Sequence, residues 1–133
     1  MKLIAANQAS QEKLENFLTS NDNVEQDLLK KKGYVVEIED NIEGCFILDS
    51  IDEGIYWLKQ LYITKDYAKS LPILLEAILA MAKEKQAKKV FVHSHQPMVD
   101  VLLEALQFYP QKENIFVDKR PIDKGSWWTY NVS

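Results

Sequence analysis

The sequence predicts an α+β fold, in which a mixed, mostly antiparallel sheet is flanked by helices. Three patterns support this class: short helical segments at the start, a strand-like run over residues 34–63, and a helix–strand–helix pattern over residues 71–108. The chain has 133 residues, only 4 glycines and 4 prolines, and no low-complexity linker. We therefore expect a single domain over residues 1–133.

Two short helices are predicted first. Ser10 is suited to cap the first of them, because a serine oxygen can accept a hydrogen bond from a free N–H group of the first turn. Asn23, with Gln26 three residues later, resembles a capping box for the second helix. The lysines at 30–32, followed by Gly33, are typical of a helix C-terminus.

Three strands of an antiparallel meander follow. From Tyr34 the hydrophobic period changes to about two, and a turn at 40–41 leads into the apolar strand at 45–48. A second turn at 52–54 leads into a strand over Ile55–Ile63.

The second half of the chain alternates helices and strands. A long helix is predicted, with one apolar face made of Leu71, Leu74, Leu75, Ile78 and Ala82. A buried strand over 89–94 comes next, and Pro97 suits the first turn of another helix. This crossover would pair the 89–94 strand parallel with the 55–63 strand. Two closing strands are expected, around 115–117 and 127–132, with Trp127 in the core and Trp128 at a cleft or partner surface.

Composition and charge exclude several classes of function. The net charge of -4 argues against a nucleic-acid-binding protein, whose surface would be basic. Apolar runs are far shorter than the ~20 residues of a membrane-spanning helix, and no leader is recognised, so a cytoplasmic location is expected. The single cysteine, Cys45, cannot form an internal disulfide. No metal is expected either. A catalytic zinc site takes three protein ligands, and the chain has only two histidines, His93 and His95, and one cysteine, Cys45, that is distant from them in the sequence.

Several segments together resemble the GNAT superfamily of acyl-CoA-dependent N-acyltransferases. Leu61-Tyr62-Ile63 is similar to the end of the fourth strand in that family. The sequence at 74–85, LLEAILAMAKEK, is similar to the helix that follows this strand, and 90–97 and 102–108 are similar to the fifth strand and the helix after it. The resemblance covers about residues 34–108 and implies a GNAT-like fold.

The resemblance also implies a site. Acetyl-CoA would be the cosubstrate and an amine, either small or on a protein, the acceptor, and the chain could assemble as a homodimer. The backbone of Leu61, Tyr62 and Ile63 would bind the pantetheine arm, and Lys69 and Ser70 would lie beside the phosphates. His95, near the end of its strand, would accept the proton of the amine; the alternative is a histidine that only forms hydrogen bonds at the turn.

Two departures from the family fall on the chemistry. The family's glycine-rich turn binds pyrophosphate through backbone N–H groups, but residues 64–72 contain no glycine. The position of the tyrosine that often protonates the leaving thiolate is occupied by Leu103. These departures favour an alternative, a catalytically inactive GNAT-fold binding or regulatory module. A third hypothesis is an unrelated interaction domain whose exposed aromatic residues contact a partner.

Overall fold

The computed structural model describes residues 1–21, 24–94, 97–110 and 126–132, and the chain divides into two compact units. The first unit comprises residues 1–49 and 58–75, and the second comprises residues 50–57 and 76–133. The single domain over 1–133 stays a prediction.

The strands form one seven-stranded sheet with the order β1-β2-β3-β4-β5-β7-β6. The strands are β1 (Lys2–Ala5), β2 (Gly33–Ile38), β3 (Asn41–Asp52), β4 (Ile55–Ile63), β5 (Lys89–Ser94), β6 (Tyr109–Pro110) and β7 (Ser126–Asn131). The carbonyl oxygen of Gly54 accepts hydrogen bonds from Lys88 N and Lys89 N, at 2.7 and 3.2 Å. Since β4 and β5 therefore begin side by side, they run in the same direction, and the sheet is mixed but mostly antiparallel, as predicted.

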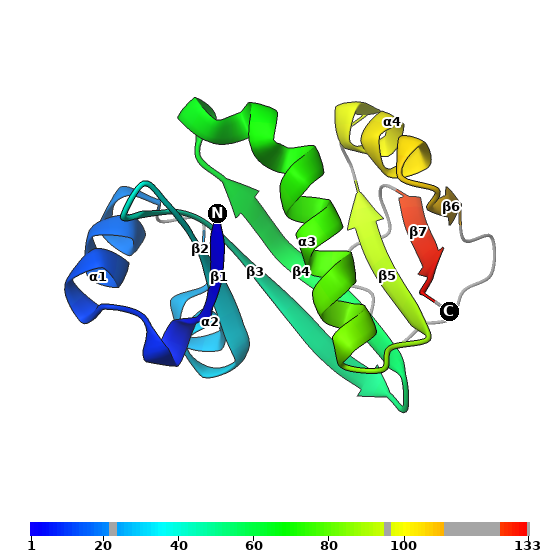
Figure 1. The fold of residues 1–133 in the computed structure, drawn as a ribbon, viewed down its shortest axis with the longest axis horizontal. Coiled ribbons are helices and arrows are strands. Elements are labelled where there is room, and N and C mark those ends of the chain that lie inside the picture. Colours follow the sequence, from blue (N-terminus) through cyan, green and yellow to red (C-terminus); the bar gives the residue numbers. More distant parts are fainter. Residues whose placement is uncertain (22–23, 95–96, 111–125, 133) are drawn as a thin grey trace. The chain divides into compact units, whose positions relative to one another are not determined.

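In the first unit, the helices α1 (Gln11–Ser20) and α2 (Gln26–Lys32) precede β2 (Figure 1). The oxygen of Ser10 accepts a hydrogen bond from Lys13 N at 3.5 Å, which confirms the predicted cap. Helix α2 ends at Lys32, with Gly33 after it, as predicted. It begins at Gln26, later than the capping box at Asn23 and Gln26 predicts, because Glu25 is the residue before its first turn and forms no side-chain cap; Asn23 itself lies outside the described residues.

Strand β1, which is only four residues long, is not predicted from the sequence. It pairs antiparallel with β2, from Lys2 opposite Glu37 to Ala5 opposite Tyr34. A run this short shows no measurable period, so only its pairing with β2 defines it as a strand. A 3-10 turn, η1 (Ala6–Gln8), separates it from α1.

The β2–β3 turn consists of Glu39 and Asp40, one residue earlier than expected. Both residues have positive φ, 52° and 69°, as a two-residue hairpin turn that matches the strand twist requires. The core of this unit forms between α1, α2 and the strands β1, β2 and β3. Its fully or almost fully buried members include Leu14, Leu18, Leu29, Val35, Cys45 and Ile47.

In the second unit, β7 pairs antiparallel with both β5 and β6. Helix α4 (Pro97–Ala105) follows β5 and leads back to β6 beside β7, whereas α3 (Leu71–Glu84) precedes β5 (Figure 1). Phe91 and Trp127 form a small core against Ile51, Ile55 and Trp57. The expected strand around 115–117 lies outside the described residues.

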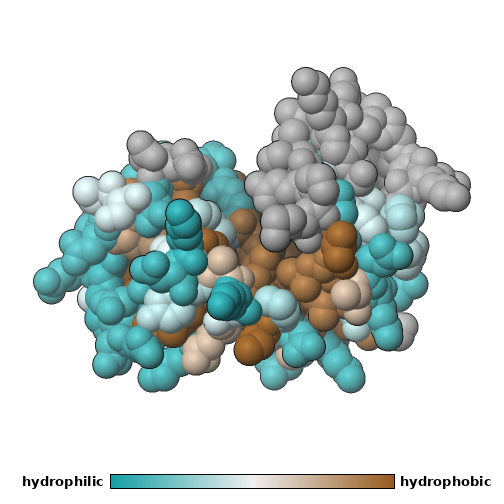
Figure 2. All heavy atoms as spheres, turned by 90° about the horizontal axis from the view of Figure 1, so that it is seen from above, coloured by the Kyte–Doolittle hydropathy of each residue, from teal (hydrophilic) through white to brown (hydrophobic). Residues whose placement is uncertain are grey.

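Hydrophilic residues cover much of the face drawn in Figure 2, as expected for a chain with 27% charged residues. Within the parts of the chain that the structure describes, no helix is both long and apolar enough to cross a membrane.

Candidate functional site

The end of β4 is shaped by a residue in the left-handed backbone region. Gln60 has a φ of 52°, which is uncommon for a residue with a side chain and interrupts the regular strand. Its side chain is fixed by Glu25 at the start of α2: Glu25 N donates to Gln60 Oε1 at 3.2 Å, and Gln60 Nε2 donates to Glu25 Oε2 at 3.0 Å. The backbone conformation of Gln60 is thus held by a residue that lies 35 positions earlier in the chain.

The three residues predicted to bind the pantetheine arm follow Gln60 directly. Leu61, Tyr62 and Ile63 are each half-buried. The Tyr62 hydroxyl donates to Asn21 Oδ1 at 2.6 Å, which ties the strand to the end of α1. On the neighbouring strand, a Cβ added to Gly44 would lie 2.7 Å from Tyr62 O, so β3 approaches the β4 backbone more closely than a side chain allows.

The strand ends at Thr64, which is anchored to β3 twice. Thr64 N donates to Glu43 O at 2.8 Å, and Thr64 Oγ1 donates to Glu43 Oε1 at 3.0 Å. After this anchor the chain enters a 3-10 turn, η2 (Lys65–Ser70), which continues without a loop into α3.

The sequence resemblance predicts a phosphate-binding site at this turn. Lys69 is exposed and Ser70 is half-buried, so the lysine can reach a ligand while the serine is partly covered. The first donor of α3 is already used, because Leu71 N donates to Ala68 O, and Pro72 has no N–H group. The helix start therefore offers an anion fewer backbone donors than a free N-terminus would.

A second hydrogen bond connects η2 to the β2–β3 turn. The Tyr67 hydroxyl donates to Glu39 Oε2 at 2.8 Å. This bond is the largest cause that raises the pKa of Tyr67, and desolvation and the negative charges of Glu39, Glu43 and Asp66 raise it further. Several carboxylates thus lie around η2, and their charge opposes that of a phosphate.

His95, the predicted proton acceptor, lies outside the described residues. The ring of His93, in the second unit, packs against Trp127 with centroids 5.0 Å apart. In the described parts of the chain, no group of three or more His, Cys, Asp or Glu residues is placed to hold a metal ion.

The expectation that Trp128 lines a cleft or partner surface is wrong. Trp128 is only 7% exposed, and its Nε1 donates to Asp100 Oδ1 at 2.8 Å, because α4 covers this part of β7. Trp127 is buried, as expected. Leu103, which the resemblance aligned with the family's tyrosine, has no exposed surface.

Sequence reasoning missed the residues that hold the site in place. The pairs Glu25–Gln60 and Glu39–Tyr67 are separated by 35 and 28 residues, respectively. Neither pair forms a local motif, and a single glutamine or glutamate in the sequence carries no signal of its partner. Only the acidic excess of residues 1–55, with 12 acidic and 5 basic side chains, pointed to carboxylates in this part of the chain.

Cys45 is expected to be inert in the folded protein. Burial raises the pKa of its thiol to about 12, and only the thiolate is nucleophilic. A disulfide reagent should therefore label the thiol readily in denaturant and only very slowly in the native state at neutral pH. Rapid labelling of the native protein would contradict the buried position.

The same burial predicts a loss of stability at alkaline pH. The native state keeps the thiol proton while the unfolded state releases it, so the free energy of unfolding should fall as the pH rises above about 9. The Cys45→Ala variant is the control: in urea denaturation, its alkaline loss should be smaller than that of the parent protein.

No protein-family model and no curated protein matches this sequence. The fold, in contrast, is similar to those of many solved structures. The N-acetyltransferase PseH from Campylobacter jejuni, solved in complex with acetyl coenzyme A, superposes with a TM-score of 0.75 at 16% identity, over 99% of each chain. A GNAT-family acetyltransferase from Staphylococcus aureus gives a TM-score of 0.71 at 18% identity, also over 99% of each chain.

A third similar structure belongs to a larger protein. The N-acetylglutamate synthase from Neisseria gonorrhoeae, complexed with coenzyme A and N-acetyl-glutamate, gives a TM-score of 0.74 at 12% identity, over 99% of this chain and 35% of that one. At such low identities these likenesses concern the fold. Together with the mixed sheet and the order of its elements, they show that this chain has the GNAT fold.

Proposed function

We propose that this protein is an N-acetyltransferase that transfers an acetyl group from acetyl-CoA to an amine, small or on a protein, in the cytoplasm. The observation that carries the proposal is the end of β4, where the left-handed Gln60 precedes the half-buried Leu61–Ile63 segment in a GNAT fold. Backbone groups in such a segment can bind an extended ligand whatever the side chains are. Structural neighbours solved with acetyl coenzyme A support this cosubstrate.

The proposed transfer is a direct attack on the thioester. The amine nitrogen forms a bond to the acetyl carbon, the carbon–sulfur bond breaks, and the sulfur leaves as the thiolate of CoA. His95 accepts the proton that the amine loses, and the thiolate takes a proton from solvent, because Leu103 cannot donate one. The protein contributes mainly by positioning the two reactants, and the β4 backbone stabilises the charge on the thioester oxygen.

The phosphates would be bound by side chains more than by backbone. Lys69 is exposed at the end of η2 and supplies a positive charge, while Ser70 supplies a hydroxyl. This arrangement replaces part of the missing glycine-rich turn, and the carboxylates around η2 weaken it.

The geometry of η2 favours a second candidate, a binding or regulatory module of the same fold without catalysis. Two hydrogen bonds support this candidate: Leu71 N donates to Ala68 O, and the Tyr67 hydroxyl donates to Glu39. If these bonds keep η2 in this conformation, few backbone N–H groups are available there to bind the pyrophosphate of the cofactor. The two candidates therefore differ in one property, the binding of acetyl-CoA.

Calorimetric titration with acetyl-CoA is expected to show binding that the Lys69→Gln variant weakens about twofold to fivefold, as the loss of one exposed charge predicts. The matched control Lys31→Gln removes an exposed lysine from α2 and should leave the affinity unchanged. In the presence of an acceptor amine, free CoA should accumulate. Absence of binding at millimolar acetyl-CoA would refute the transferase and leave the non-catalytic module.

A further inference from the structure

A small pocket in the first unit adjoins the end of β4 at Thr64, but none of Leu61–Ile63 and no residue of η2 lines it. It has a volume of about 200 Å³ and lies between α1, the start of β3 and Thr64. Pockets for drug-sized ligands occupy about 300–1,000 Å³. This one is therefore too small for a coenzyme and suits a ligand of the size of an amino acid.

A firmly held carboxylate forms one side of the pocket. Glu43 is half-buried, and Thr64 anchors it through both its backbone oxygen and its Oε1. An ionised carboxylate can accept about four hydrogen bonds. The contact with Thr64 thus orients the group and leaves acceptor capacity for a cationic ligand.

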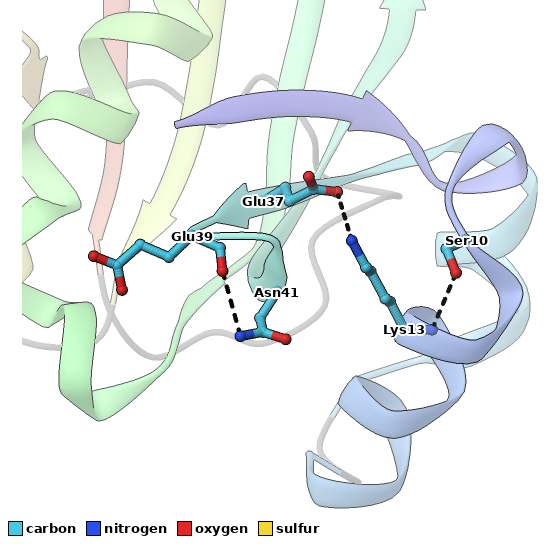
Figure 3. A network of polar contacts seen from close by, with 5 residues as sticks. All are labelled: Ser10, Lys13, Glu37, Glu39 and Asn41. Carbon is cyan, nitrogen blue, oxygen red and sulfur yellow. Dashed lines mark hydrogen bonds and ion pairs between the residues drawn. The ribbon is translucent and has the colours of Figure 1, made fainter.

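A positive charge lines the same pocket from α1. The Nζ of Lys13 is 4.0 Å from Glu37 Oε2, longer than the ~2.7–2.9 Å of a direct charged hydrogen bond. Figure 3 shows this side chain reaching from α1 toward β2, while Asn41 lies at the start of β3. Lys13 thus forms a long ion pair with Glu37, and among the described residues its ammonium makes no direct hydrogen bond. An ammonium has three donors, so it can also bind a carboxylate in the pocket.

The other walls are rigid or neutral. Asn21 is committed twice, since its Nδ2 donates to Phe17 O at 2.8 Å and its Oδ1 accepts from Tyr62. Phe17 and Ile42 supply apolar surface, and the remaining polar groups are uncharged amides and hydroxyls. The lining therefore carries one positive and one negative charge on a largely fixed frame.

We propose that this pocket binds a small zwitterion of the free α-amino-acid class, with its ammonium at Glu43 and its carboxylate at Lys13. A ligand with a single charge would satisfy only one of the two lining charges. The proposal does not rest on acetyl transfer, because it uses neither the Leu61–Ile63 backbone nor Lys69.

Chemical-shift titration of the isotope-labelled protein tests both charges of the ligand. L-Alanine, L-valine and L-asparagine are used as probes, and at least one should shift the amide signals around the pocket at millimolar concentration. The N-acetyl and amide derivatives of the bound amino acid should bind at least about tenfold more weakly, because each lacks one charge. Equal binding of either derivative, or no binding of any probe, would overturn the proposal.

Substitutions locate the binding in the pocket. Glu43→Gln keeps an oxygen that can accept the hydrogen bond from Thr64. Each of the two single variants, Glu43→Gln and Lys13→Gln, should lower the affinity for the amino acid about tenfold or more. Glu12→Gln and Lys30→Gln, which lie outside the pocket lining, serve as controls and should leave the affinity unchanged. Thermal melting of each variant confirms folding. An unchanged affinity for the amino acid in both pocket variants would refute this site. Binding of acetyl-CoA is measured independently, so this outcome would not affect the proposed acetyltransferase function.

Discussion

Replacement of Leu74 by alanine is expected to lower the free energy of unfolding by about 2–5 kcal/mol. Leu74 lies in the first turn of α3, directly after η2, and has no exposed surface. The substitution removes buried methyl groups and leaves a cavity that neighbouring side chains fill only in part. Urea denaturation measures the change from the shift of the midpoint at constant slope.

The adjacent residue provides a matched control. Ile73 belongs to the same helical turn but is 61% exposed, so Ile73→Ala should change the free energy of unfolding by less than about 0.5 kcal/mol. Alanine is also a better helix former than isoleucine, which offsets part of any loss. Equal effects of the two substitutions would contradict the placement of the apolar face of α3.

Gly44→Ala is expected to cost about 1–3 kcal/mol of stability, although it adds only one methyl group. The new Cβ would lie 2.7 Å from Tyr62 O and 3.4 Å from Ile63 Cα, and backbone atoms cannot turn aside as a side chain can. Strands β3 and β4 would have to separate at the segment proposed to hold the cosubstrate. We therefore expect a lower melting temperature together with weaker acetyl-CoA binding in calorimetry.

Ser50→Ala is the control for this prediction. Ser50 lies in the same strand, β3, but is exposed, so its loss of a hydroxyl should alter neither quantity measurably. A Gly44→Ala protein as stable as the parent would show that the close approach of the two strands is not required. A destabilised variant with unchanged acetyl-CoA affinity would remove this part of β4 from the proposed site.

Much of the fold could be predicted because it depends on local patterns. The apolar face of α3 recurs at helical spacing, and Leu74, Leu75, Ile78 and Ala82 are all fully buried. Ser10 and Gly33 mark helix ends by their own chemistry. Strand β1 was missed since its four residues show no period, and Trp128 was misplaced since nothing local reveals that Asp100 and α4 cover it.

Some features of the candidate site likewise follow from the sequence alone, and others do not. The sequence by itself determined that residues 61–63 end a strand before a long helix, and that no glycine is present to form a phosphate-binding turn. It also placed Lys69 and Ser70 just before that helix, because their order along the chain is enough to do so.

Only the tertiary structure decided how this strand end is shaped and held. The left-handed Gln60 is fixed by Glu25, and η2 is joined to the β2–β3 turn through Tyr67 and Glu39. Such partners are brought together by strand pairing and helix packing across some thirty residues, and no local propensity encodes them. The sequence therefore specified which elements form, whereas the long-range hydrogen bonds specified the geometry in which a ligand could bind.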